Sequence, residues 1–215
     1  MCKTWLLLSL TVAVFPQSPA NDSLIVPDIR VGPVTRTSTE QSLRHAFGRL
    51  AVNENVGVGE GVDEPGLVLY PTQPARRLEI TWNSAQPPHP AMIFICPSSN
   101  GACEWRTSRG IGIGTTLREL ENLNARPFEM VGWGSDVGGN LTSFRGGRLE
   151  KELPGLRMTL YPRTDANGEY LPRLTDREIS QVDGERFLLS SNPVLQTLNP
   201  SVAGMVLVFP GEPRR

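Results

Sequence analysis

The sequence predicts an α+β protein in which two related units each combine a helix with an antiparallel sheet. The first observation behind this is an internal repeat: the Val-Gly-Val-Gly block at residues 56–59 recurs as Val-Gly-Trp-Gly at residues 131–134. The second is a helix-start signal before each block, and the third is a run of strand-forming residues after each. Because such a repeat means that one supersecondary unit is used twice, it predicts architecture and names no reaction.

Each unit opens with a capping box, a pair of side chains that satisfies the free N–H groups at a helix start. Ser38 and Gln41 form this pattern in the first unit, and Thr116 and Glu119 form it in the second. Apolar residues follow at helical spacing in both, and Pro127 prevents the second helix from continuing.

Strands are predicted where apolar and β-branched residues gather between turn signals. These runs are 29–31, 66–70, 78–82, 92–95, 104–107, 140–144, 148–150, 156–161 and 205–209. A helical turn is expected between residues 190 and 200. Because the last run is so apolar, we expect it to pair with the second unit rather than to lie at an exposed edge.

Residues 1–20 have the pattern of a secretory signal peptide: Lys3, an apolar run, and a small-residue ending at Ala20. The apolar run is about a dozen residues long, whereas a spanning helix needs roughly 20. The alternative, an N-terminal core helix, is disfavoured because Pro16 and Pro19 would break it. We expect a periplasmic or secreted protein with no transmembrane segment after cleavage.

The remaining chain divides into a first α+β unit at residues 21–90, a disulfide-stapled hairpin or connector at 91–107, and a second unit with a C-terminal extension at 108–215. In an exported chain, Cys96 and Cys103 with their turn-rich spacer predict a disulfide, worth about 2 to 3 kcal/mol on the chain-entropy model. A metal site or redox pair is the alternative. The spacing is not that of C-x-x-C, and His89 is the only nearby histidine.

The composition gives no sign of nucleic acid or an anionic membrane as a partner, since the formal net charge is −1 and no run of like charge occurs. The glycine-rich stretch at residues 110–114 precedes a helix, as in phosphate-binding loops. It does not follow an apolar parallel strand, and glycines that let a helix approach a sheet explain it equally well. No cofactor is therefore expected.

Nucleophilic catalysis needs a positioned base, and the only histidines are His45 and His89. Neither lies near a glycine-flanked serine or a free cysteine in the sequence. We therefore assign no catalytic residue and no metal ligands.

The candidate binding residues lie in the two repeated glycine-rich blocks. Glu60, Asp63 and Asp136 are, together with Glu64, the densest acidic positions there, and Trp133 lies between two glycines. An aromatic side chain on a loop can contact a protein or a sugar ring, because it supplies a large area at low entropic cost. The alternatives are that the carboxylates are solvated loop charges and that Trp133 packs over the edge of a sheet.

The stretch from residue 110 to residue 139 carries Gly-Thr-x-Leu-x-Glu-Leu-x-x-x-Asn, then Pro-Phe, then Gly-Trp-Gly-x-Asp-x-Gly-Gly. It resembles a pattern in exported bacterial proteins with no assigned activity. The paired helix-and-sheet units also resemble, at fold level, the tandem units of secreted beta-lactamase-inhibitor-like proteins, although the disulfide placement and the long C-terminal tail differ. Fold likeness of this kind assigns no function.

These observations favour a non-enzymatic periplasmic or secreted protein that binds another protein or a cell-envelope component through its glycine-rich aromatic loops. The alternative is an envelope hydrolase that uses Asp136 together with Glu60 or Asp63. In a third, purely structural interpretation the loops only brace the sheets.

Overall fold

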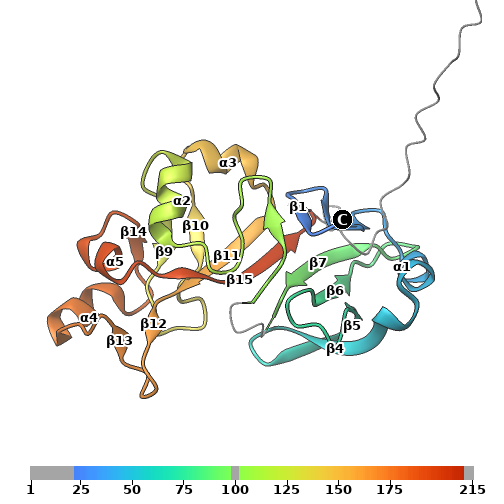
Figure 1. Ribbon diagram of the computed structural model, residues 1–215, viewed down its shortest axis with the longest axis horizontal. Coiled ribbons are helices and arrows are strands. Elements are labelled where there is room, and N and C mark those ends of the chain that lie inside the picture. The colour runs from blue at the N-terminus through green and yellow to red at the C-terminus, as the bar shows by residue number, and fades with distance from the viewer. Residues whose placement is uncertain (1–21, 98–101, 211–215) are drawn as a thin grey trace, which may run out of the picture.

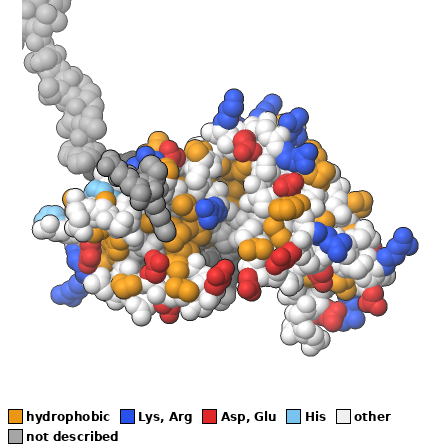
Figure 2. Space-filling view, turned by 180° about the vertical axis from the view of Figure 1, so that it is seen from behind, with side chains coloured by type: hydrophobic (Ala, Val, Ile, Leu, Met, Phe, Trp, Pro, Cys, Tyr) orange, Lys and Arg blue, Asp and Glu red, His pale blue; other side chains and the backbone are white. Residues whose placement is uncertain are grey.

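The computed structural model describes residues 22–97 and 102–210 and has a strand-rich α+β fold, as predicted (Figure 1). The signal peptide expected at residues 1–20 lies outside the described residues. The described strands form four sheets, and the longest strands meet in the largest of them. Acidic and basic side chains are intermixed over the face of the molecule seen in Figure 2.

The largest sheet has six strands in the order β11-β15-β7-β6-β5-β4, and all its neighbours are antiparallel. Its strands are β4 (Ala51–Gly59), β5 (Val62–Leu69), β6 (Leu78–Trp82), β7 (Pro90–Ile95), β11 (Leu156–Tyr161) and β15 (Ser201–Val208). Figure 1 shows β15 crossing the middle of the molecule to reach β7. The sheet thus joins strands of both predicted units, and the last strand pairs with β11 of the second unit, as expected.

Three small sheets complete the fold, in the orders β3-β2-β1-β8, β10-β9-β14 and β12-β13. Their strands are β1 (Leu24–Val26), β2 (Arg30–Val31), β3 (Val34–Thr35), β8 (Arg106–Thr107), β9 (Glu129–Val131), β10 (Leu141–Ser143), β12 (Arg163–Thr164), β13 (Tyr170–Leu171) and β14 (Phe187–Leu189).

The helices are short, and four of the described α-helices begin with a side-chain cap. They are α1 (Glu40–Phe47), the 3₁₀ turn η2 (Gly48–Leu50), α2 (Leu117–Asn124), α3 (Arg148–Glu152), α4 (Asp176–Val182) and α5 (Pro193–Leu198). The predicted capping box at Thr116 and Glu119 is confirmed. Asn192 caps α5, the helical turn expected between residues 190 and 200.

The capping box of α1 lies one residue later than predicted. Thr39, not Ser38, is the N-cap, and Ser42 takes the place expected for Gln41. The Ser38 hydroxyl is used instead to close the preceding turn, where it accepts a hydrogen bond from the Thr35 N–H at 3.0 Å.

Two strand predictions are wrong. Residues 148–150 form the start of α3, because a turn at Gly146 (φ 69°) presents the Leu149 N–H to the Asn124 side chain at 3.1 Å. The expected return strand at 104–107 does not pair with β7. Its ordered part, β8, pairs in parallel with β1 in another sheet.

The Cys96–Cys103 disulfide is confirmed, with the two Cα atoms 5.9 Å apart. It lies beside the fully buried Trp105, whose indole N–H donates to the Arg76 carbonyl oxygen at 3.0 Å. The Arg76 guanidinium in turn lies 4.7 Å from the centre of the buried Tyr70 ring. The disulfide therefore closes a loop next to a well-packed part of the core.

The two glycine-rich blocks have the same order of elements around them: a helix, a strand, a glycine-rich connection and an antiparallel strand. In the first copy the connection is a tight turn. Glu60 and Gly61 both have positive φ, 52° and 71°, as a type I′ hairpin turn requires. Most of the first block is thus part of the β4–β5 hairpin, whereas the second block is a longer connection between β9 and β10.

Candidate functional site

Trp133 is buried, as its packing interpretation expects. Only 3% of its surface is accessible, and its indole N–H donates to the Leu160 carbonyl oxygen at 2.9 Å. Its ring packs against Tyr170 at a centroid distance of 5.9 Å. The packing interpretation therefore explains Trp133, which fastens the second glycine-rich block to β11.

Tyr170 is held in the same region by a hydrogen bond of 3.0 Å from its hydroxyl to Asp183 Oδ1. Burial is the main reason why the pKa of Tyr170 is raised to about 12, and the hydrogen bond to Asp183 and the negative charge of Asp183 contribute to the same shift. The neutral phenol is favoured in the folded protein. The contribution of this neutral hydroxyl to the free energy of unfolding is therefore complete below pH 10 and is lost as the pH rises through about 12.

We expect a spectrophotometric pH titration to show one tyrosine that ionises near pH 12. Tyr170→Phe should remove this transition. Asp183→Asn should shift it to lower pH while burial keeps it above the ordinary value. A Tyr170 that ionises near pH 10 in the folded wild type would contradict the contact with Asp183.

The three predicted carboxylates lie in two places. Glu60 and Asp63 are exposed on the β4–β5 hairpin, and Asp136 is exposed on the connection that packs on β11. β4 and β11 are the opposite edge strands of the six-stranded sheet. None of the three carboxylates forms a side-chain hydrogen bond or an ion pair within the described residues.

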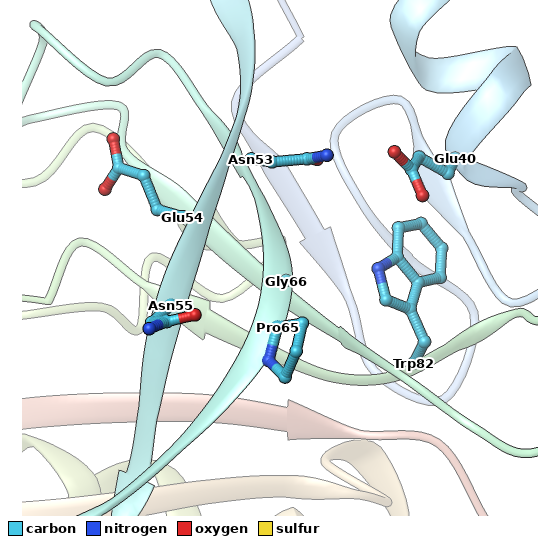
Figure 3. A pocket seen from close by; sticks show the side chains of 7 residues that line it. All are labelled: Glu40, Asn53, Glu54, Asn55, Pro65, Gly66 and Trp82. Atoms are coloured by element: carbon cyan, nitrogen blue, oxygen red, sulfur yellow. The ribbon is translucent and has the colours of Figure 1, made fainter.

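A groove with a volume of about 370 Å³ lies beside the β4–β5 hairpin. Figure 3 shows Asn53 and Trp82 pointing toward Glu40, whereas Glu54 points the other way. The lining residues come from α1, β4, β5 and β6, and they are Glu40, Asn53, Glu54, Asn55, Pro65, Gly66 and Trp82. The sequence did not single out these residues as a site.

Strand register explains why this groove is open. Side chains of cross-strand partners share a face, and Asn53 pairs with Leu67 while Asn55 pairs with Pro65. Leu67 is buried in the core, whereas Asn53, Asn55 and Pro65 are exposed. The core face of the sheet therefore continues beyond α1 as a surface with amide groups and a half-buried tryptophan, Trp82.

The charged residues at the groove are held by arginines. Glu40 pairs with Arg44 one helical turn later at 2.8 Å, and Arg44 also donates to the Asn53 side chain. On the other face, Glu54 pairs with Arg77 at 2.6 Å. Partial burial lowers the pKa of Arg77, but the hydrogen bonds to Glu79 and Glu54 and the charges of these carboxylates together outweigh it and raise the pKa above its ordinary value. Glu40, Asn53 and Glu54 of the groove are thus each held by an arginine.

The outer edge of β4 pairs with no strand among the described residues. The other edge strand, β11, is covered in part: the Leu160 N–H donates to the Gly139 carbonyl at 2.8 Å, and Asn140 bridges to Thr159. A long edge strand with unpaired N–H and C=O groups is a template for another strand. β4 is such an edge.

The glycine-rich stretch before α2 does not leave an anion site. The Leu117 N–H donates to the Pro200 carbonyl, the Arg118 N–H donates to the Asn199 side chain, and the Glu119 N–H donates to the Thr116 hydroxyl. The free N–H groups that bind phosphate at other helix starts are already used here.

The two histidines lie in α1 and in the connection between β6 and β7. His45 is exposed on α1, and the His89 Nδ1 atom lies 3.1 Å from the Ser38 carbonyl oxygen. No group of three or more His, Cys, Asp or Glu side chains that could hold a metal ion occurs in residues 22–97 and 102–210. Nor is any helix of these ranges both long and apolar enough to cross a membrane.

Comparison with models of protein families, with curated proteins and with solved structures finds no match for this chain.

Proposed function

We propose that this chain is a non-enzymatic periplasmic or secreted binding protein that takes an extended segment of another protein into the groove beside the β4–β5 hairpin. The observation that carries the proposal is the combination of a free strand edge with an adjoining groove that holds Trp82 and Pro65. Exposed strand edges bind peptides through main-chain hydrogen bonds, and neighbouring pockets select the side chains. The first glycine-rich block provides this edge.

The exported location rests on the signal-peptide pattern at residues 1–20 and is supported by the disulfide, which is typical of oxidising compartments. The envelope hydrolase is the second candidate. It requires Asp136 to converge with Glu60 or Asp63 at the separation that two-carboxylate hydrolysis uses. Their places at opposite edges of the sheet order favour binding over hydrolysis.

The proposal predicts a specific response of the Trp82 indole. We would titrate ¹⁵N-labelled protein with short threonine-based peptides that carry leucine and, two positions away in either order, lysine, alanine or glutamate. At least one peptide should shift the Trp82 indole signal, while those of Trp105 and Trp133 stay in place because both are buried and internally bonded.

Trp82→Ala should abolish peptide binding. The matched control is Phe187→Ala, which removes an aromatic side chain that is 71% exposed on a different sheet and should leave binding unchanged. If no peptide shifts the Trp82 indole signal, or if only a soluble tetramer of N-acetylglucosamine shifts it, the protein does not bind extended polypeptide in this groove.

A further inference from the structure

The hydrogen-bond pattern of the hairpin shows which groups of β4 face outward. The Tyr70 N–H donates to the Leu50 carbonyl at 2.8 Å, so this pair is hydrogen-bonded. Hydrogen-bonded and non-hydrogen-bonded pairs alternate along antiparallel strands. In the register of β4 and β5, Asn53, Asn55 and Gly57 are therefore non-hydrogen-bonded to β5. Their N–H and C=O groups point away from β5, toward the free edge.

Proline at position 65 is consistent with this assignment. Pro65 pairs with Asn55 and has no N–H to donate, so it can occupy only a position that needs no hydrogen bond to β4. The outward groups of β4 thus recur at every second residue, which is the spacing that an added strand uses.

The side chains on the groove face define two adjacent contacts for an added strand. Beyond Asn55, its cross-strand partner Pro65 and then Trp82 line the groove and offer apolar surface. Two residues along, Gly57 pairs with Asp63, and a Cβ built on Gly57 would lie 3.5 Å from Asp63 Oδ1. Because Gly57 has no side chain, the Asp63 carboxylate is accessible across β4 from its free edge.

The charges of the hairpin favour a cationic occupant. Glu60, Asp63 and Glu64 are exposed and form no ion pair within the described residues. Arg44, which reaches the groove residues Glu40 and Asn53, is already used by them. A lysine or arginine of a partner would meet the Asp63 carboxylate without displacing an existing pair.

We propose that the partner adds as a strand to the free edge of β4, with an apolar side chain opposite Asn55 and a lysine or arginine side chain opposite Gly57, facing Asp63. This rests on the proposed function and specifies its partner: an extended polypeptide segment with an apolar and a cationic residue two positions apart.

The first test separates main-chain from side-chain contacts. Asn55→Pro removes the outward N–H and the side chain, whereas Asn55→Ala removes only the side chain. Both keep the pairing with β5, because an edge strand accepts proline where the N–H faces outward. Asn55→Pro should lower the affinity for the peptide that carries leucine and lysine about tenfold more than Asn55→Ala does.

The same hydrogen bonds can be removed from the peptide, which avoids any effect on folding. N-methylation of the alternate peptide amides that point toward β4 should abolish binding to the wild type. Methylation of the amides in between, which point away from β4, should be tolerated. Equal effects of Asn55→Pro and Asn55→Ala, together with indifference to N-methylation, would overturn strand addition while leaving groove binding intact.

The second test concerns the charge. Asp63→Asn should lower the affinity for the leucine–lysine peptide about threefold, because an exposed ion pair contributes little. The affinity for the leucine–alanine peptide should stay unchanged. Glu64→Gln is the matched control, since Glu64 pairs with Val56 and its side chain lies on the opposite face. Equal losses in both variants would overturn the specific contact with Asp63. A dimer of wild type that Asn55→Pro dissolves would mean that a second copy occupies the edge.

Discussion

Replacing Trp133 with alanine should lower the free energy of unfolding by about 3 to 5 kcal/mol. The indole is buried, packs against Tyr170 and donates to the Leu160 carbonyl. Its removal leaves a cavity and an unpaired carbonyl between the second glycine-rich block and β11. Denaturant unfolding followed by circular dichroism measures the loss.

Trp82→Ala provides the contrast, because Trp82 is only half-buried and should cost less stability while it removes binding. If Trp133→Ala leaves stability within about 1 kcal/mol of wild type yet abolishes peptide binding, Trp133 belongs to the binding site and not to the packing.

Asn124→Ala should destabilise the protein by about 3 kcal/mol, since it leaves buried main-chain groups without partners. The Asn124 amide donates to the carbonyls of Arg126 and Phe144 at 2.9 and 3.0 Å and accepts from the Leu149 N–H at 3.1 Å. One buried side chain thus connects the end of α2 with the start of α3.

The matched control is Asn122→Ala, which changes an exposed asparagine of the same helix and should stay within about 0.5 kcal/mol of wild type. Thermal and denaturant unfolding of the two variants can be compared directly. A loss below about 1 kcal/mol for Asn124→Ala would mean that water replaces its three bonds.

The sequence allowed the fold class, the disulfide and α2 to be predicted because each depends on a local signal. Thr116 and Glu119 form the capping box where the pattern places it, and β6 and β11 have the predicted bounds. Local signals also account for what was missed. Thr175 and Glu178 form a third capping box, which begins α4, and their spacing is the same as that of Thr116 and Glu119.

Predictions that depend on long-range contacts were less successful. The start of α3 is fixed by Asn124, a residue that is distant in the sequence. Glycines around Trp133 suggested a loop whose tryptophan could contact a partner. Two of them instead allow close packing of the backbone, since a Cβ on Gly132 would lie 2.4 Å from the Val182 carbonyl and one on Gly139 2.3 Å from the Leu160 carbonyl.

The groove was missed because the first glycine-rich block was taken as a loop. As a strand, it continues Val52-Asn53-Glu54-Asn55, in which the two asparagines alternate and therefore share a face. That alternation is visible in the sequence, but the approach of Glu40 and Trp82 to the same face comes from the tertiary fold.

The most direct test of strand binding is amide hydrogen exchange along β4. In the free protein the outward N–H groups of Asn53, Asn55 and Gly57 should exchange fast, while the inward groups of Glu54 and Val56 are protected by β5. Saturation with the leucine–lysine peptide should slow the outward amides selectively. If the peptide binds and the outward amides still exchange as in the free protein, the partner does not add as a strand at β4.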